Sequence, residues 1–201
     1  IIMQRIFLIM KKLTALFIAI MTFIFTLTSC GADKLDIPEG MQLVENEKNT
    51  YSFFVPEDWS VDVQEESGVS AAYASDKSNV SLMIFDWDGT AGSLQEYCDN
   101  YFTTVTTTFK EVSDREMYSD NQYFGTIGGN GEPVLKYVYT IVSDNAATEE
   151  VETYKIMQVF AYYSENIVDG GNIYIFTYTA RTELYDSHLE EVYDIINEFI
   201  A

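Results

Sequence analysis

One short acidic run in this sequence could hold a metal ion. Asp86-Trp87-Asp88-Gly89 places two carboxylates on alternate positions ahead of a glycine. In known calcium loops, acids spaced in this way turn their oxygens toward the cation. The run lacks the rest of an EF-hand loop, including its final glutamate, so a solvated turn is the alternative interpretation. Asp86 and Asp88 are therefore the residues on which a calcium site would depend, and the sequence indicates no other cofactor.

The sequence offers little for nucleophilic or acid–base catalysis. Its single histidine, His188, stands beside Asp186 at the start of an expected helix, where a polar helix-end residue is the simple interpretation. Cys98 falls within an apolar helical stripe, which predicts a small buried hydrophobe and not a reactive thiol. One histidine and two cysteines also exclude a conventional zinc site. We therefore expect no enzyme activity; a hydrolase is a lower-ranked alternative that needs two close carboxylates in a deep pocket.

The other cysteine, Cys30, ends a pattern typical of export. Lys11 and Lys12 precede an uncharged apolar run over 13–27, which has the length of a signal-peptide core and is short for a membrane span. Thr28-Ser29-Cys30 resembles the lipobox of bacterial lipoproteins, whose cysteine is lipidated before the leader is removed. An ordinary secretory leader is the alternative. We expect a signal peptide at 1–29. Ile1 is no ordinary start, and Met10 before Lys11 and Lys12 is the expected one, so 1–9 would not be native; Met3 with Arg5 is the alternative start.

The balance of charge limits the partners of the exported chain. Removing the leader takes the formal net charge from -21 to -24, because the leader holds three basic residues and no acid. Such a chain is a poor ligand for nucleic acid, which binds through Lys and Arg. It is also repelled by anionic lipid, so lipid on Cys30 must attach it to the membrane. We expect an extracytoplasmic, lipid-anchored location, with a polar tether over 30–40 and a single domain over 41–201.

The domain shows strand patterns for most of its length and two helical patterns. The first helix is marked by Ser93 and Glu96 in capping-box spacing, and the second by Ser187 and Glu190. Alternating or continuous apolar runs predict strands. These runs cover 41–44, 51–55, 59–63, 69–74, 80–87, 112–118, 122–127, 134–142, 151–163 and 173–179. The order of elements predicts an α+β fold around one antiparallel sheet, and strands apolar on both sides predict a sheet covered on both faces.

Three segments resemble the PsbP-like family. They are the runs 51–59 (YSFFVPEDW), 176–180 (FTYTA) and 195–199 (IINEF), which together span the whole domain. The resemblance implies a central antiparallel β-sheet flanked by helices on both faces, an α/β/α sandwich. It implies an accessory or binding role, since the family shares no catalytic motif. The lipid anchor and the high acidity depart from the photosynthetic members, so a photosystem role does not follow.

These observations favour a noncatalytic binding or accessory protein held at the membrane by lipid on Cys30. Its expected partner is an unidentified protein or another component of the cell envelope. The fifteen tyrosines could line a glycan-binding or peptide-binding surface, although packing within a sheet also explains them. A calcium-binding surface protein using Asp86 and Asp88 is the alternative function.

Overall fold

The computed structural model describes residues 36–49, 51–87, 92–109, 111–118, 134–145, 150–163 and 171–199. Two compact units make up the chain, Ile1–Asp36 and Ile37–Ala201, and every described helix and strand belongs to the second. Cys30 and Asp88 lie outside the described residues, as do the signal peptide over 1–29 and the expected strand over 122–127. The described residues include no helix long and apolar enough to span a membrane.

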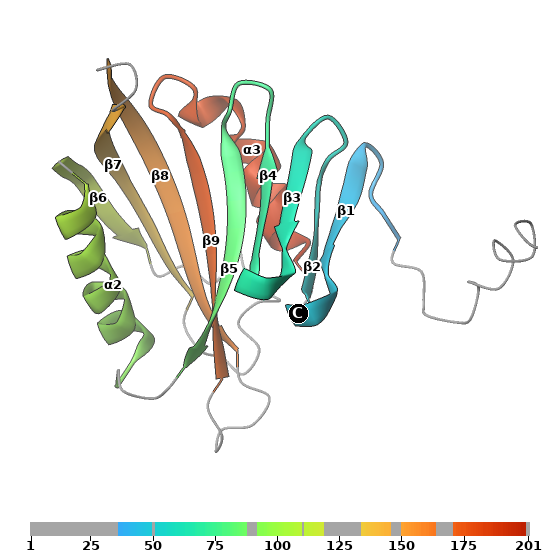
Figure 1. Cartoon of the computed structure of the whole chain (residues 1–201), viewed down its shortest axis with the longest axis horizontal. Helices are drawn as coiled ribbons and strands as arrows, with labels where there is room; N and C mark the ends of the chain where they lie inside the picture. The colour runs from blue at the N-terminus through green and yellow to red at the C-terminus, as the bar shows by residue number, and fades with distance from the viewer. Residues whose placement is uncertain are drawn as a thin grey trace, which may run out of the picture. The chain divides into compact units, whose positions relative to one another are not determined.

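Strands make up most of the described domain, and Figure 1 shows them as a broad curved sheet. The two α-helices of the described residues are α2 (Leu94–Thr108) and α3 (Leu189–Asn197). Short 3-10 turns are η1 (Glu47–Asn49), η2 (Glu65–Ser67) and η3 (Tyr185–Ser187). The strands are β1 (Met41–Asn46), β2 (Tyr51–Pro56), β3 (Ser60–Gln64), β4 (Val69–Tyr73), β5 (Asn79–Trp87), β6 (Glu111–Tyr118), β7 (Leu135–Asn145), β8 (Glu150–Tyr163) and β9 (Gly171–Arg181).

Seven of these strands form one antiparallel sheet in the order β3-β4-β5-β9-β8-β7-β6. The last strand, β9, lies in the middle, with Leu82 opposite Phe176 on one side and Val159 opposite Phe176 on the other. The first two strands pair only with each other, as a separate antiparallel ribbon. This strand order therefore requires pairing between distant parts of the chain.

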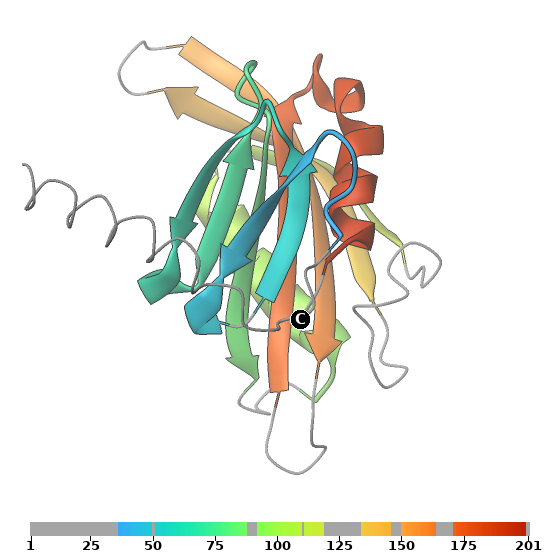
Figure 2. The ribbon, with the colours of Figure 1, turned by 90° about the vertical axis from the view of Figure 1, so that its right-hand side faces the viewer.

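Two hydrophobic cores lie on opposite faces of this sheet. Along β9 the side chains alternate, so that Phe176 packs into the core that contains α3 while Ile175 packs into the core beneath α2. The α3 core also takes Phe53 from β2, whose ring meets that of Phe176 edge-on at 6.4 Å between centroids. The β1–β2 ribbon thus covers part of the same face as α3, and Figure 2 shows both elements beside the sheet.

The expected sheet flanked by helices on both faces is wrong as a description of this domain. The structure is mostly β, and its α3 face is covered jointly by one short helix and the β1–β2 ribbon. On the other face, α2 packs over β7, β8 and β9, and the core beneath it includes no described side chain of β3, β4 or β5. Apolar strands do predict cover, but a strand ribbon supplies part of that cover and one end of the sheet has no helix above it.

The two helix starts also differ from each other. The Ser93 hydroxyl accepts a hydrogen bond from the Glu96 backbone N–H at 3.1 Å, so the expected cap of α2 is confirmed. The expected cap at Ser187 is wrong, because Ser187 belongs to η3 and α3 begins one residue after His188, without a side-chain cap. A 3-10 turn has therefore replaced the start that the sequence spacing predicted.

Candidate functional site

One end of the α2 face of the sheet is not covered by α2. Met83 lies opposite Ile175, and Phe85 opposite Ile173, so all four point to the α2 side because directly paired residues share a face. The same register continues outward through β4 and β3. We call the resulting surface the open face, and it consists of Ser60, Asp62, Gln64, Val69, Ala71, Tyr73, Ser81, Met83 and Phe85.

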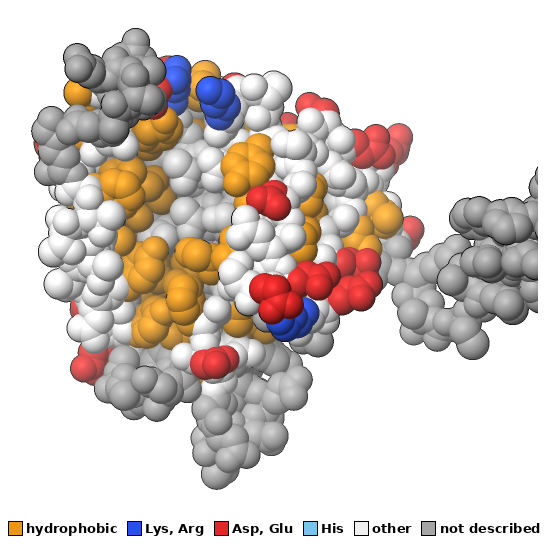
Figure 3. Space-filling model, in the orientation of Figure 1, with side chains coloured by type: hydrophobic (Ala, Val, Ile, Leu, Met, Phe, Trp, Pro, Cys, Tyr) orange, Lys and Arg blue, Asp and Glu red, His pale blue; other side chains and the backbone are white. Residues whose placement is uncertain are grey.

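Apolar side chains occupy the inner part of the open face. Tyr73 and Phe85 remain 39% and 41% exposed, while Val69 and Met83 are half-buried. None of these four belongs to either hydrophobic core or to the partly buried side chains packed against them. Figure 3 shows hydrophobic side chains on this side of the molecule between α2 and β3. Val69, Met83 and Phe85 adjoin one another, whereas Tyr73 lies at the other end of β4. Adjoining exposed apolar side chains commonly mark an interaction site.

The outer edge of the open face is polar and acidic. Asp62 on β3 is exposed, and Glu65 and Glu66 follow it in η2. A surface hollow of about 480 Å³ opens here, lined by Glu45, Val63, Gln64, Glu65, Glu66 and Ser67. Lys48 reaches Glu66 with 2.6 Å between Nζ and Oε2. Figure 3 shows the acidic side chains gathered near the ends of β1 and β3.

A second hollow, of about 490 Å³, lies near the ends of β8 and β9 and is lined by Val151, Glu152, Thr153, Arg181 and Glu183. It contains two carboxylates, so it is the place at which to examine the hydrolase alternative. Glu152 is already engaged, since the Tyr154 hydroxyl donates to it at 2.6 Å and Arg181 forms an ion pair with it. The hydrogen bond from Tyr154 and the Arg181 charge lower the pKa of Glu152. A general acid needs a raised pKa, so this carboxylate is unsuited to that role.

His188 uses both of its ring nitrogens in polar contacts. Its Nδ1 lies 2.7 Å from Glu191 and its Nε2 lies 3.0 Å from Asp76, in the turn between β4 and β5. Burial alone would lower the pKa of His188, but hydrogen bonds to Glu191 and Asp76 outweigh burial and raise it. The Trp59 ring meets the imidazole edge-on, with 5.5 Å between centroids. Both nitrogens are therefore engaged, and the ring joins α3 to the sheet.

Sequence reasoning placed His188 correctly at a helix end but missed this bridge. The expected neighbour Asp186 is not among its hydrogen-bond partners. Glu191 stands three residues later in the sequence, a spacing that could have suggested a contact across one helical turn. Asp76 is 112 residues away in the chain, and no local pattern points to it.

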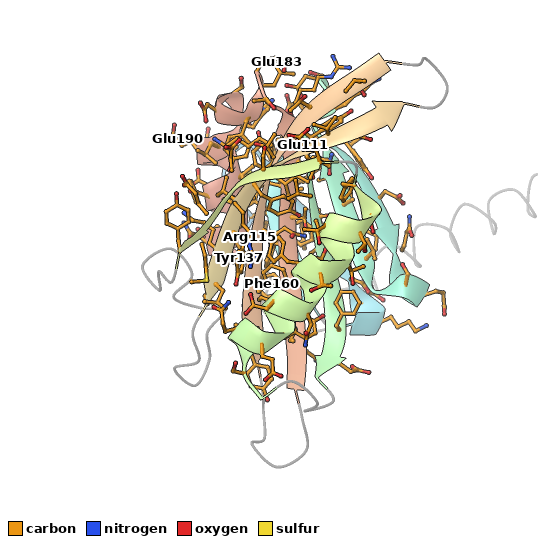
Figure 4. All side chains as sticks on the ribbon, turned by 90° about the vertical axis from the view of Figure 1, so that its left-hand side faces the viewer. Glu111, Arg115, Tyr137, Phe160, Glu183 and Glu190 are labelled. Atoms are coloured by element: carbon orange, nitrogen blue, oxygen red, sulfur yellow. The ribbon has the colours of Figure 1, made fainter. Side chains whose placement is uncertain are left out.

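Aromatic packing beneath α2 accounts for several of the tyrosines. Tyr137 and Tyr139 are buried, and the Phe102 ring lies between them at 4.6 Å and 5.2 Å centroid to centroid. Arg115 from β6 covers Phe102 at 4.1 Å, and Figure 4 shows it beside Tyr137 and Phe160. These aromatic residues pack in the core, as sheet packing predicts. Tyr73, in contrast, belongs to the open face.

A buried polar cluster supports the sheet next to the open face. The amide oxygen of Gln158 accepts from the Tyr139 hydroxyl at 2.8 Å, and its amide nitrogen donates to Tyr101 and Thr177 at 3.1 Å each. Thr177 lies opposite Ser81 of the open face. The side-chain amide of Gln158 thus links α2, β7 and β9, which fixes the sheet on which the open face stands.

The remaining sequence-predicted residues do not converge on a described site. Cys98 is buried, as expected, and burial raises the pKa of its thiol to about 12, so it is unreactive. Asp86 is exposed on β5 opposite Asn172. Among the described residues, no three His, Cys, Asp or Glu side chains are grouped to hold a metal. The calcium hypothesis therefore depends in part on Asp88, and the lipidation hypothesis on Cys30, both outside the described residues.

Similarity to known proteins lies in the fold. No model of a known family matches the sequence, and no curated protein matches it. The solution structure of cyanobacterial PsbP (CyanoP) from Synechocystis is similar with a TM-score of 0.54 and 18% identity, over 87% of this chain and 98% of that one. The Ran-binding protein Mog1p of Saccharomyces cerevisiae aligns with a TM-score of 0.46 and 9% identity, over 80% of this chain and 94% of its own. The chain has a PsbP-like fold.

Proposed function

We propose that this chain is a lipid-anchored, noncatalytic binding or accessory protein on the extracytoplasmic face of the cell membrane. The observation that carries the binding role is the open face. It exposes Tyr73 and Phe85 on a sheet surface that packs into neither core. Leaving such side chains in water forgoes the free energy of burying them, which a bound partner recovers. The partner is a protein or another component of the cell envelope.

The anchoring role is supported by the sequence before the domain. Lys11, Lys12, the apolar run over 13–27 and Cys30 follow the order of a lipoprotein leader. The first described residues after it, Asp36, Ile37, Glu39 and Gly40, are exposed, which suits a tether. An acidic domain gains nothing from anionic lipid, so the acyl chains on Cys30 would provide the attachment.

The noncatalytic assignment is supported by the state of the candidate reactive groups. His188 has both ring nitrogens bound to carboxylates, Cys98 is buried, and Glu152 has a lowered pKa. A nucleophile needs a free base beside it, and a general acid needs a raised pKa. No observation favours the calcium alternative over this one, and the role of Asp86 and Asp88 stays a prediction.

The anchoring part is tested by expressing the full chain in a bacterium and separating membranes from soluble protein. We expect the wild type in the membrane fraction and a lipid-modified Cys30 in the mass spectrum of the mature N-terminal peptide. Cys30→Ser is the matched control and should move to the soluble fraction or keep its leader. Wild-type protein that carries an unmodified Cys30 would contradict the anchor.

The binding part is tested by crosslinking in those membranes. A photo-reactive residue placed at Phe85 should give a defined crosslinked product. The same residue at Val61, which lies on the opposite face of the sheet, should not. Position 61 suits the comparison because Val61 pairs with Ala72 of the α3 core and is similarly exposed, at 38%. Equal crosslinking from the two positions would contradict a binding role for the open face.

A further inference from the structure

We propose that the open face binds a basic protein segment that also carries apolar side chains. This proposal rests on the binding function above and names the chemistry of its partner. The apolar side chains of the segment would cover Val69, Met83 and Phe85, and its Lys or Arg side chains would meet the acidic edge at β3 and η2. The argument combines the apolar surface, the sign of the surrounding charge and the exclusion of other occupants.

The apolar contribution comes from side chains that the fold itself leaves uncovered. Met83 and Phe85 lie beside Ile175 and Ile173 on the same face of the sheet, and both isoleucines are fully buried. The exposed sides of Met83 and Phe85 therefore form part of the surface of the seven-stranded sheet. An exposed sheet surface of this kind suits extended or irregular chain, which can lay several side chains across it, better than a compact small molecule, which binds in a concave pocket.

The charge contribution selects a basic partner. Asp62 belongs to the open face, and the hollow next to Gln64 is lined by Glu45, Glu65 and Glu66. Lys48 offsets one of these charges, because it pairs with Glu66. The edge therefore has an excess of negative charge, and complementary charge on a partner aids both encounter and specificity.

Other occupants fit less well. A second copy of the chain would also carry a formal net charge of -21. The acidic edge would repel it. A membrane surface with anionic lipid is disfavoured for the same reason. The hollow of about 480 Å³ has room for a Lys or Arg side chain, and three glutamates line it, of which Glu66 already pairs with Lys48. A basic segment thus satisfies both parts of the surface together.

The test uses the full-length lipoprotein in nanodiscs of phosphatidylcholine, so that no detergent covers the open face. The probe is a short fluorescent peptide in which Lys alternates with Val, and binding is measured by anisotropy. Two matched peptides replace Lys by Glu or Val by Ser. We expect binding of the Lys–Val peptide alone, and weaker binding at higher salt because the charges are screened.

Variants locate the bound peptide. Phe85→Ser should weaken binding about tenfold, the value of burying part of one large apolar side chain. Asp62→Lys should weaken it about threefold, as expected for one exposed charge contact. Val61→Ser, which removes a similarly exposed side chain on the other face, should change nothing. Thermal melting of each variant checks that the fold is retained.

Several results would overturn the proposal. Equal binding by wild type and folded Phe85→Ser would remove the open face from the interaction. Equal binding of the Lys–Ser peptide would show general attraction to an acidic protein, and binding of the Glu–Val peptide would show apolar contact without charge selection. Failure of the Lys–Val peptide, with a crosslink still formed from position 85, would reject the basic segment and leave the binding function standing. Tight association with protein-free nanodiscs through Phe85 would assign the face to lipid.

Discussion

Some side chains that could be reactive are engaged in structural contacts in this protein. His188 is the clearest case, because a histidine beside acids can be a catalytic base or a structural bridge. Here Asp76 and Glu191 hold both ring nitrogens, and the ring is largely buried against Trp59. The imidazole therefore joins the β4–β5 turn to α3 and has no lone pair left for a substrate.

This bridge predicts a particular dependence of stability on pH. The pKa of His188 is raised above its ordinary value of 6.5, so the folded state binds the proton more tightly than the unfolded state. The stabilisation is fully present below pH 6.5 and is lost as the pH rises through the raised pKa. Urea unfolding of wild type and His188→Gln should therefore differ most at mildly acidic pH and converge in alkaline solution.

Asp76 sets the lower limit of that pH window. Burial alone would raise its pKa, but hydrogen bonds from Ser78 and His188 lower it, so its contribution is lost as the pH falls through that lowered value. The comparison of wild type with His188→Gln is therefore made above the titration of Asp76. A difference between the two proteins that stays constant into alkaline solution would contradict a charged bridge.

At the residue scale, the sequence predicts burial better than it predicts partners. Cys98 lies in a helical apolar stripe, and its burial follows directly from that spacing. The partners of His188 and of Gln158 come from distant strands, so no local spacing reveals them. Tyr73 and Tyr139 look alike in the sequence, because both alternate along strands, yet one is exposed and the other buried.

At the scale of elements, the two helices provide a direct comparison of helix starts. Both show Ser and Glu in the same spacing, but only Ser93 accepts a hydrogen bond from the third residue after it. Ser187 is drawn into η3 instead, whose hydrogen bond runs from the Ser187 N–H to the Leu184 carbonyl. The Ser and Glu spacing therefore allows a side-chain cap but does not ensure one. The conformation of the preceding turn determines whether the cap forms.

This difference predicts the effect of two matched substitutions. Ser93→Ala should lower the free energy of unfolding by about 1 kcal/mol, because the Glu96 backbone N–H loses its partner. Ser187→Ala should change it by less than about 0.5 kcal/mol, as for ordinary exposed positions. Denaturant unfolding followed by circular dichroism measures both. Equal losses at the two serines would mean that Ser187 does cap α3.

At the scale of the whole molecule, the strand ranges follow from the sequence but the sheet order does not. Alternation along β4 and β5 predicts a hairpin, and the structure confirms that pairing. Placing β9 between β5 and β8 pairs Leu82 with Phe176, a contact set by global packing. The open face also arises at this scale, because strands apolar on both sides predicted full cover and α2 reaches only one end of the sheet.

The acidity of the whole molecule bears on the calcium hypothesis, because any cation will screen a net charge of -21. Selective binding is different: a site at a hundred times its dissociation constant adds about 2.7 kcal/mol to the free energy of unfolding. The exposed Asp86 belongs to no group of three potential ligands among the described residues. We therefore expect thermal melting in calcium, magnesium and EDTA to coincide at matched ionic strength.

The control for that experiment is Asp86→Asn, which removes one charge and keeps the shape of the side chain. If screening alone acts, the variant and the wild type should respond equally to calcium and magnesium. A shift selective for calcium that disappears in Asp86→Asn would establish the cation site and make Asp88 its next candidate ligand. The role inferred for the acidic surface would then change: it would concentrate calcium at the membrane and would not serve to attract a basic partner.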